Sequence, residues 1–186
     1  MNIKSISIAL LSLVFSASAY ATTYTYNTDA SINSTGGGTK SSPLGGSPLI
    51  LTAGEQFTVS TDPSQIWLGA DRPGDPNAGT LTTTANGTTN ASWNLGNFGF
   101  FLPGLPFVQI GSLIGEINDV YAFIGAGTKT FTAWETGALT FQYADINKSD
   151  NAGIIVSNVT VPEPMTPVLV GFGLLALLAM RRKTQQ

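Results

Sequence analysis

The sequence contains neither cysteine nor histidine. Without thiols or imidazoles the chain cannot form disulfides, and it lacks a thiol nucleophile, a Ser-His-Asp triad and the usual ligands of zinc or haem. The metal ligands that remain are oxygen atoms. Any bound metal would therefore be a hard cation such as calcium.

Charged side chains are scarce, at 10% of the chain. Between Thr22 and Val161 there are ten acidic and four basic residues, a formal net charge of −6. Nucleic-acid binding depends on clustered lysine and arginine that contact phosphates. We therefore expect no nucleic-acid partner.

A full-length membrane-spanning run is also missing. The apolar stretch near the end covers thirteen residues from Val168 to Met180, or sixteen from Met165. A hydrocarbon core about 30 Å thick needs about 20 helical residues. The sequence thus predicts a short transmembrane helix over 165–180. It is either an ordinary anchor or, as we expect, a disposable one that holds the chain in the membrane only transiently.

The flanks of this helix favour the second interpretation. Basic residues follow it and are expected to stay on the cytoplasmic side. Prolines precede it and prevent the helix from extending backward, because proline lacks the amide donor and restricts the residue before it. An extended, accessible peptide would therefore stand just outside the membrane. These flanking residues are Pro162, Pro164 and Pro167 before the helix and Arg181, Arg182 and Lys183 after it.

The first 21 residues are typical of a secretory signal peptide. A single charge at Lys4 precedes an apolar stretch, and Ala19 and Ala21 fit an A-x-A cleavage site. Cleavage by signal peptidase after Ala21 would make Thr22 the first mature residue. The alternative is a buried N-terminal strand.

The order of proline-flanked glutamate, apolar helix and basic pair resembles the PEP-CTERM sorting signal of Gram-negative bacteria. The resemblance implies a 162–186 sorting region that is recognised by an exosortase, an integral-membrane protease, after export across the inner membrane. It further implies delivery to the cell surface or the exopolysaccharide matrix. The motif residues are Val161, Pro162, Glu163, Pro164, Arg181 and Arg182.

The remaining chain is predicted to be all-β. Short apolar or alternating runs are separated by Gly, Pro, Asn and Asp, and no run sustains a helical period. We expect a two-sheet β-sandwich or jelly roll over 48–161, after a flexible lead-in over 22–47 that is rich in Gly and Ser. The predicted strands are 48–51, 56–60, 65–68, 79–84, 108–117, 120–124, 129–134, 137–143 and 154–161.

The loop before the last strand, "YADINKSDNAGIIV", gathers oxygen-bearing side chains. Asp145, Asp150 and Asn151 lie within seven residues. Calcium takes six to eight oxygens and tolerates irregular geometry, so such a loop is a candidate calcium site. A solvated hairpin is the alternative, because Asp, Asn and Ser also favour turns for local reasons.

Four segments resemble, in order, the PA-IL-like, galactose-binding-type domain of calcium-dependent bacterial lectins: "GSLIGEIN", "FIGAG", "GALTFQYAD" and "DNAG". The resemblance implies one calcium ion that bridges protein oxygens to two sugar hydroxyls. Carried over by position, the side chains of Asp145, Asp150 and Asn151 would bind it, with main-chain carbonyls near Lys148 and near Trp67. The loop is shorter than in the sugar-binding prototype, so calcium with carbohydrate and purely structural calcium both stay open.

Enzymatic activity is not expected. Glycoside hydrolysis needs two carboxylates across a cleft, and Glu116 is expected to point outward into solvent from its strand. Trp67 and Trp93 have the aromatic faces that stack on sugars, but tryptophan in a sandwich is more often part of the core.

Overall fold

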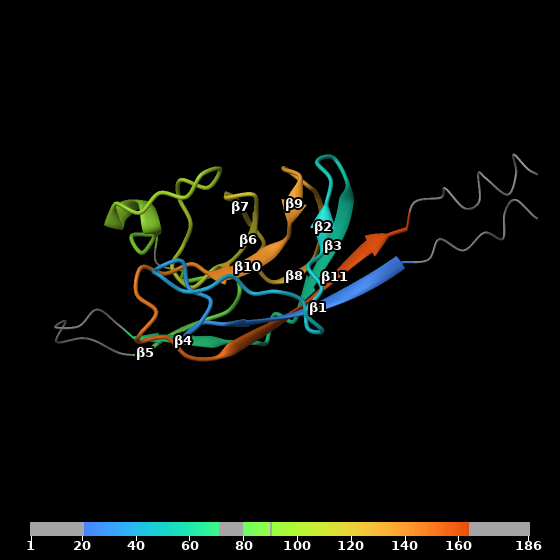
Figure 1. The fold of residues 1–186 in the computed structure, drawn as a ribbon. Coiled ribbons are helices and arrows are strands. Elements are labelled where there is room, and N and C mark those ends of the chain that lie inside the picture. The colour runs from blue at the N-terminus through green and yellow to red at the C-terminus, as the bar shows by residue number, and fades with distance from the viewer. Residues whose placement is uncertain (1–20, 71–79, 90, 164–186) are drawn as a thin grey trace, which may run out of the picture. The chain divides into compact units, whose positions relative to one another are not determined.

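The computed structural model describes residues 21–70, 80–89 and 91–163, and within them the chain is all-β apart from one short 3-10 helix, Leu95–Phe98. The two main sheets have the strand orders β1-β11-β3-β8 and β10-β6-β7, and β2-β9 and β4-β5 form two-stranded ribbons (Figure 1). The strands are β1 (Ala21–Asp29), β2 (Ile50–Leu51), β3 (Gln56–Thr61), β4 (Trp67–Ala70), β5 (Thr80–Thr83), β6 (Leu113–Ile117), β7 (Val120–Phe123), β8 (Gly127–Thr132), β9 (Gly137–Ala138), β10 (Thr140–Tyr143) and β11 (Ile154–Pro162).

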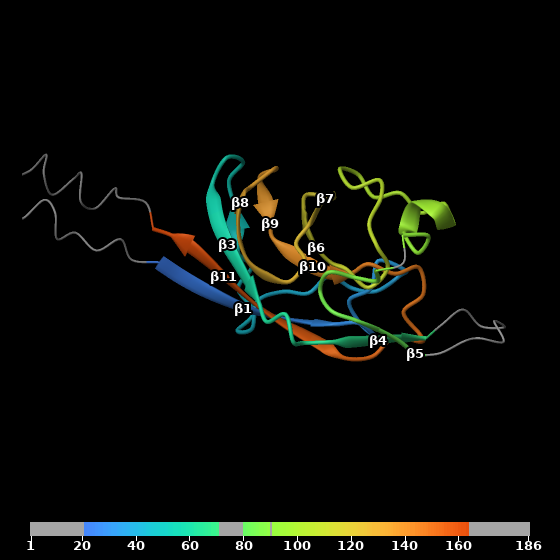
Figure 2. The same cartoon turned by 180° about the vertical axis from the view of Figure 1, so that it is seen from behind.

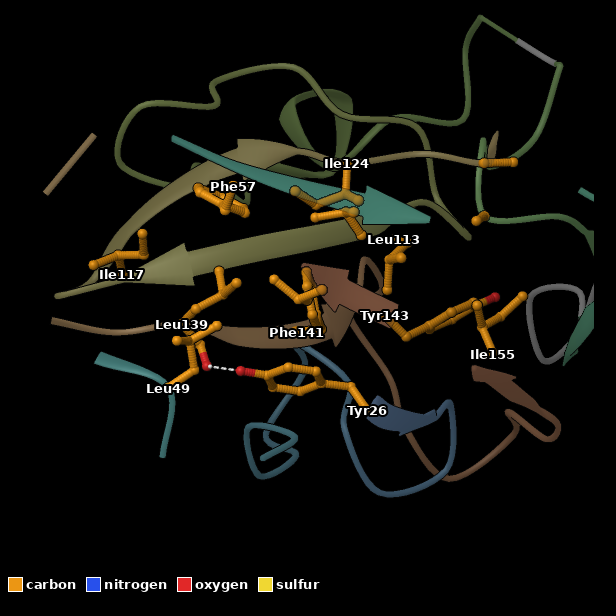
Figure 3. Packing of buried hydrophobic residues seen from close by; sticks show 14 of the residues in the cluster. Tyr26, Leu49, Phe57, Leu113, Ile117, Ile124, Leu139, Phe141, Tyr143 and Ile155 are labelled. Atoms are coloured by element: carbon orange, nitrogen blue, oxygen red, sulfur yellow. Dashed lines mark hydrogen bonds between the residues drawn. The ribbon is translucent and has the colours of Figure 1, made fainter. Parts of the chain in front are cut away.

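The two main sheets share one hydrophobic core, as expected of a β-sandwich. Alternation along each strand turns every second side chain inward. Phe57 and Val59 of β3 thus meet Leu113 of β6 and Phe141 of β10 in a single buried cluster (Figure 3). The one polar atom that Tyr26 brings into this cluster is satisfied, because its hydroxyl donates to the Leu139 carbonyl at 3.0 Å.

Strand β6 is buried on both of its faces. Its inward face contributes to the shared core, and Ile114 on the other face packs in a second cluster with Leu95, Leu102 and Val108. The apolar segment around residues 95–110 therefore covers the outer face of the β10-β6-β7 sheet.

The lead-in predicted to be flexible over 22–47 is wrong in its first part. Residues Ala21–Asp29 form β1, which lies beside β11 in the four-stranded sheet (Figures 1 and 2). The residues "TTYTYNT" alternate as a strand with one buried face should. Its pairing partner, β11, lies more than 120 positions later in the chain. The residues around β1 therefore gave no local indication of this pairing.

Most of the other predicted strands are confirmed with shifted ends. The stretch predicted as one strand over 137–143 is divided into β9 and β10, which belong to different sheets. The stretch predicted over 108–117 begins only at Leu113.

Candidate metal centre

The loop between β10 and β11 begins at Asp145, whose side chain is turned back into the loop. Its residue is 8% exposed, and its Oδ1 accepts hydrogen bonds from the Ile146 amide at 2.6 Å and the Asn147 amide at 3.4 Å. A carboxylate that receives main-chain amides at the start of a tight turn is held in one orientation.

Two further side chains of this loop carry buried oxygens without a hydrogen-bond partner. These are Asp150 Oδ1 and Asn151 Oδ1. The Asn151 residue is 6% exposed, and its Nδ2 donates to the Asn147 carbonyl at 2.7 Å, which fixes the amide plane. Buried polar atoms in folded proteins are nearly always paired, because an unpaired one loses its hydration without compensation. Two such acceptors side by side in sequence indicate a missing donor or cation.

The electrostatics of the loop point in the same direction. Burial raises the pKa of the Asp145 carboxyl, and the neighbouring negative charge of Asp150 raises it further, against the opposing effect of the Asn151 side chain and the loop amides. Burial, followed by the charge of Asp145, also raises the pKa of Tyr143. Two carboxylates and a phenol therefore share a volume in which added negative charge is disfavoured. A cation bound there would reverse this preference.

The structure brings Lys148 into the same loop. Its carbonyl accepts a long hydrogen bond of 3.4 Å from the Asn151 amide, and its exposed side chain donates to the Gly37 carbonyl at 2.9 Å. A carbonyl has two lone pairs, so this one retains the capacity to bind a cation.

Trp67 lies near the loop, but its side chain belongs to the core. The residue is fully buried, and its ring packs edge-on against Tyr143 with centroids 4.6 Å apart. The amide and carbonyl of Leu68 both pair with Ala152, at 2.7 Å each. Main-chain groups alternate between the two edges of a strand, so those of Trp67 face Thr83 of β5. Trp67 thus offers no exposed face for sugar stacking, and its carbonyl as a ligand stays a prediction.

The donor set fits a hard cation better than a transition metal. Within the described residues no group of three or more His, Cys, Asp or Glu side chains gathers around one point. The loop instead offers two carboxylates, one amide oxygen and main-chain carbonyls. Calcium accepts this mixture of oxygens, whereas zinc and iron sites usually include nitrogen or sulfur ligands.

A second buried carboxylate lies on β6, where Glu116 was expected to be solvated. That expectation is wrong, because Glu116 is 3% exposed. Its Oε2 lies 3.0 Å from the Lys40 ammonium and accepts from the Thr140 hydroxyl at 2.7 Å, and its Oε1 accepts from the Asp119 amide. Lys40 also pairs with the Asp119 carboxylate at 2.9 Å. The Glu116 oxygens are thus fully engaged with partners from the protein itself.

The residues assigned to export and processing lie at or beyond the ends of the described chain. Ala21 is the first residue of β1, and Val161 and Pro162 are the last two residues of β11. Glu163 follows directly. Ala19, Pro164, Arg181, Arg182 and the predicted helix over 165–180 lie outside the described residues. In the part of the chain that the structure describes, no helix is long and apolar enough to cross a membrane.

Sequence reasoning missed the residues that support this loop from the outside. They belong to the 33–39 segment, which was assigned to a flexible lead-in, and Thr35 and Ser34 donate hydrogen bonds to the Asp145 carbonyl. The asparagine, serine, threonine and glycine of this stretch are typical of a compact loop, which is the one local signal that it carried.

Comparison with known proteins yields a limited result. No family model matches the chain, and no curated protein matches it. Among solved structures, one described as "EclA N-terminal domain; PllA-like lectin" is similar to this chain. It shares 19% sequence identity, with a TM-score of 0.44, over 75% of this chain and 96% of that one.

Proposed function

We propose that this protein is an exported surface or matrix protein whose β-sandwich binds one calcium ion in the loop between β10 and β11. The observation that carries the proposal is the pair of buried, unpartnered oxygens, Asp150 Oδ1 and Asn151 Oδ1, in the same loop as the buried Asp145 carboxylate. Their side chains, with a carbonyl near Lys148, would hold the ion. Bound calcium would supply a positive charge beside the two carboxylates of this loop.

Calcium commonly keeps coordination positions for oxygens from outside the protein. We propose that hydroxyls of an exopolysaccharide occupy such positions, which would make the domain a carbohydrate-binding module. The resemblance of the four segments to calcium-dependent lectins supports this part. Binding to a panel of immobilised glycans in calcium, and loss of that binding in EGTA, is the expected result; glycan binding that is equal in both buffers would contradict it.

The export part rests on sequence segments at the two ends of the chain. Signal peptidase would cut after Ala21, and an exosortase would remove the tail after recognising the motif that begins at Val161. Mass spectrometry of both ends of the native protein tests the two cuts together. Full-length, untrimmed protein inside the cell would contradict this part.

The calcium site is tested by thermal unfolding of the purified full chain with and without calcium. A ligand present at about 100 times its Kd stabilises the folded state by about 2.7 kcal/mol. For a domain of this size that corresponds to a rise in Tm of about 5–10 °C. We expect the double variant Asp145→Ala/Asp150→Ala to lose this rise.

A matched control removes the same number of charges elsewhere. Asp62 and Glu135 belong to the same domain outside the loop, and Asp62→Ala/Glu135→Ala should keep the full calcium response.

The alternative function is a structural sandwich without ligand, which the lack of a three-residue acidic cluster in the described residues favours. An unchanged wild-type melting curve in calcium and EGTA would establish that alternative.

A further inference from the structure

The 33–39 segment lies against the end of β10, where the candidate calcium loop begins. Ser34 forms a parallel bridge with Tyr143, the last residue of β10. The Thr35 amide donates to the Tyr143 carbonyl at 3.0 Å, and the Tyr143 amide donates to the Asn33 carbonyl at 2.7 Å. A segment about 110 positions earlier in the chain is therefore aligned, by main-chain bonds, with the residues just before Asp145.

The hydroxyl of Thr35 holds both main-chain polar groups of Asp145. It donates to the Asp145 carbonyl at 2.6 Å and accepts from the Asp145 amide at 3.0 Å. The buried Ser34 hydroxyl adds a weaker donation to the same carbonyl at 3.3 Å. With both groups engaged, the backbone of Asp145 has one orientation, and this orientation sets the direction in which its carboxylate enters the loop.

The next residues of the segment contact the loop itself. At Gly36 a Cβ atom would lie 2.2 Å from the carbonyl carbon and oxygen of Ile146, so the two backbones touch at a distance that only glycine permits. The Gly37 carbonyl accepts from the Lys148 ammonium at 2.9 Å. Among the described residues, the ion pairs formed are those of Lys40, so Lys148 pairs with neither carboxylate of its own loop.

We propose that the 33–39 segment is part of the calcium site and that Thr35 is its positioning residue. The inference rests on the proposed calcium binding and extends it to a residue that does not touch the ion. Groups that orient a metal ligand through hydrogen bonds commonly change metal affinity by about 10–100-fold when they are removed. A site held in its binding geometry before the ion arrives also loses less conformational freedom on binding.

The test measures calcium affinity by isothermal titration calorimetry of the purified full chain. Thr35→Val keeps the shape of the side chain and removes both bonds to Asp145, and we expect it to weaken calcium binding at least tenfold. Thr35→Ser restores the hydroxyl and should bind within about threefold of the wild type. Thr130→Val is the matched control, because Thr130 is exposed on β8, outside the 33–39 segment and the loop, and its hydroxyl pairs with that of Thr58 at 3.1 Å.

Melting temperatures in EGTA separate positioning from a merely structural role. If Thr35 positions Asp145, Thr35→Val should lose more Tm relative to the wild type in calcium than in EGTA, so that its calcium-induced rise in Tm is smaller. Equal losses of Tm in both buffers, or an affinity of Thr35→Val for calcium equal to that of Thr130→Val, would overturn the inference. If the wild type itself shows no calcium binding, the proposed function fails, and the inference fails with it for that separate reason.

Discussion

The domain buries carboxylates in two places, and the two differ in the partners that their oxygens have. Glu116 receives a lysine ammonium, a hydroxyl and a main-chain amide from its own chain. Asp145 is buried beside the charge of Asp150, and Asp150 and Asn151 both keep an unpartnered oxygen. A buried charge is tolerated when it is paired and hydrogen-bonded. The carboxylate in the first place is paired within the chain, and the second place keeps oxygens without a partner, which is why we propose a cation there.

This difference assigns distinct roles to the two places. Each oxygen of the Glu116 carboxylate has a partner from its own chain and its charge is paired with Lys40, so the Glu116 group stabilises the packing of β6 against the segment around Lys40. Acceptors that stay open in a folded domain keep a cost that only a ligand removes. We therefore expect calcium to raise the stability of the domain through the Asp145 loop. The contribution of the Glu116 group should be the same with and without calcium.

The largest expected effect comes from breaking the internal pair. Lys40→Met leaves the buried Glu116 without its cation, and we expect a loss of about 2 kcal/mol. This value lies between the 3–5 kcal/mol typical of a fully buried pair and the small contribution of an exposed one, because Lys40 is partly exposed. Urea unfolding measures the loss, which should be equal in calcium and in EGTA. A loss that calcium alters would end the distinction between the two places.

A second substitution, at Glu116, tests whether the loss comes from the unpaired buried charge. Glu116→Gln added to Lys40→Met removes the buried charge that Lys40→Met leaves unpaired. The double variant should therefore recover at least half of the loss, since neighbouring residues of one network are not additive. A double variant as unstable as the sum of the two single variants would show that the pair contributes through packing alone.

The stability of the calcium-free protein should depend on pH through Asp145. Folding raises the pKa of Asp145, mainly through burial. Such a carboxyl stabilises the folded state most when it is protonated, below its unfolded pKa, and this contribution is lost as the pH rises through the folded pKa. In EGTA, the wild type should therefore gain stability relative to Asp145→Asn as the pH falls from 7 to 4. Parallel pH profiles of the two proteins would contradict the expectation.

The smallest expected effect concerns Lys148. Its ammonium is a positive charge within the calcium loop, held on the Gly37 carbonyl rather than on a carboxylate. Lys148→Met should tighten calcium binding by about twofold at low ionic strength, because a nearby like charge is removed, and the gain should shrink in concentrated salt. Weaker binding of this variant would mean that the side chain supports the loop instead.

The sequence predicted the parts of this domain that local patterns determine. Short apolar or alternating runs predicted β3 and β11, and the density of Asp and Asn predicted the loop between β10 and β11, where calcium binding stays a prediction. What it did not predict depends on partners that are distant in the chain. Glu116 is buried because Lys40, 76 positions earlier, neutralises it, and Thr35 reaches Asp145 across 110 positions. The residues around Lys40 and Thr35 show no local pattern that would predict these contacts.

Calcium titration of the purified full chain in a calorimeter, beside Asp145→Ala/Asp150→Ala and Lys40→Met, decides whether the loop between β10 and β11 binds the ion. We expect one calcium ion per chain for the wild type and for Lys40→Met, and none for the double carboxylate variant. Heat of binding that survives in Asp145→Ala/Asp150→Ala, or its absence from the wild type, would show that the open oxygens of this loop are not a calcium site.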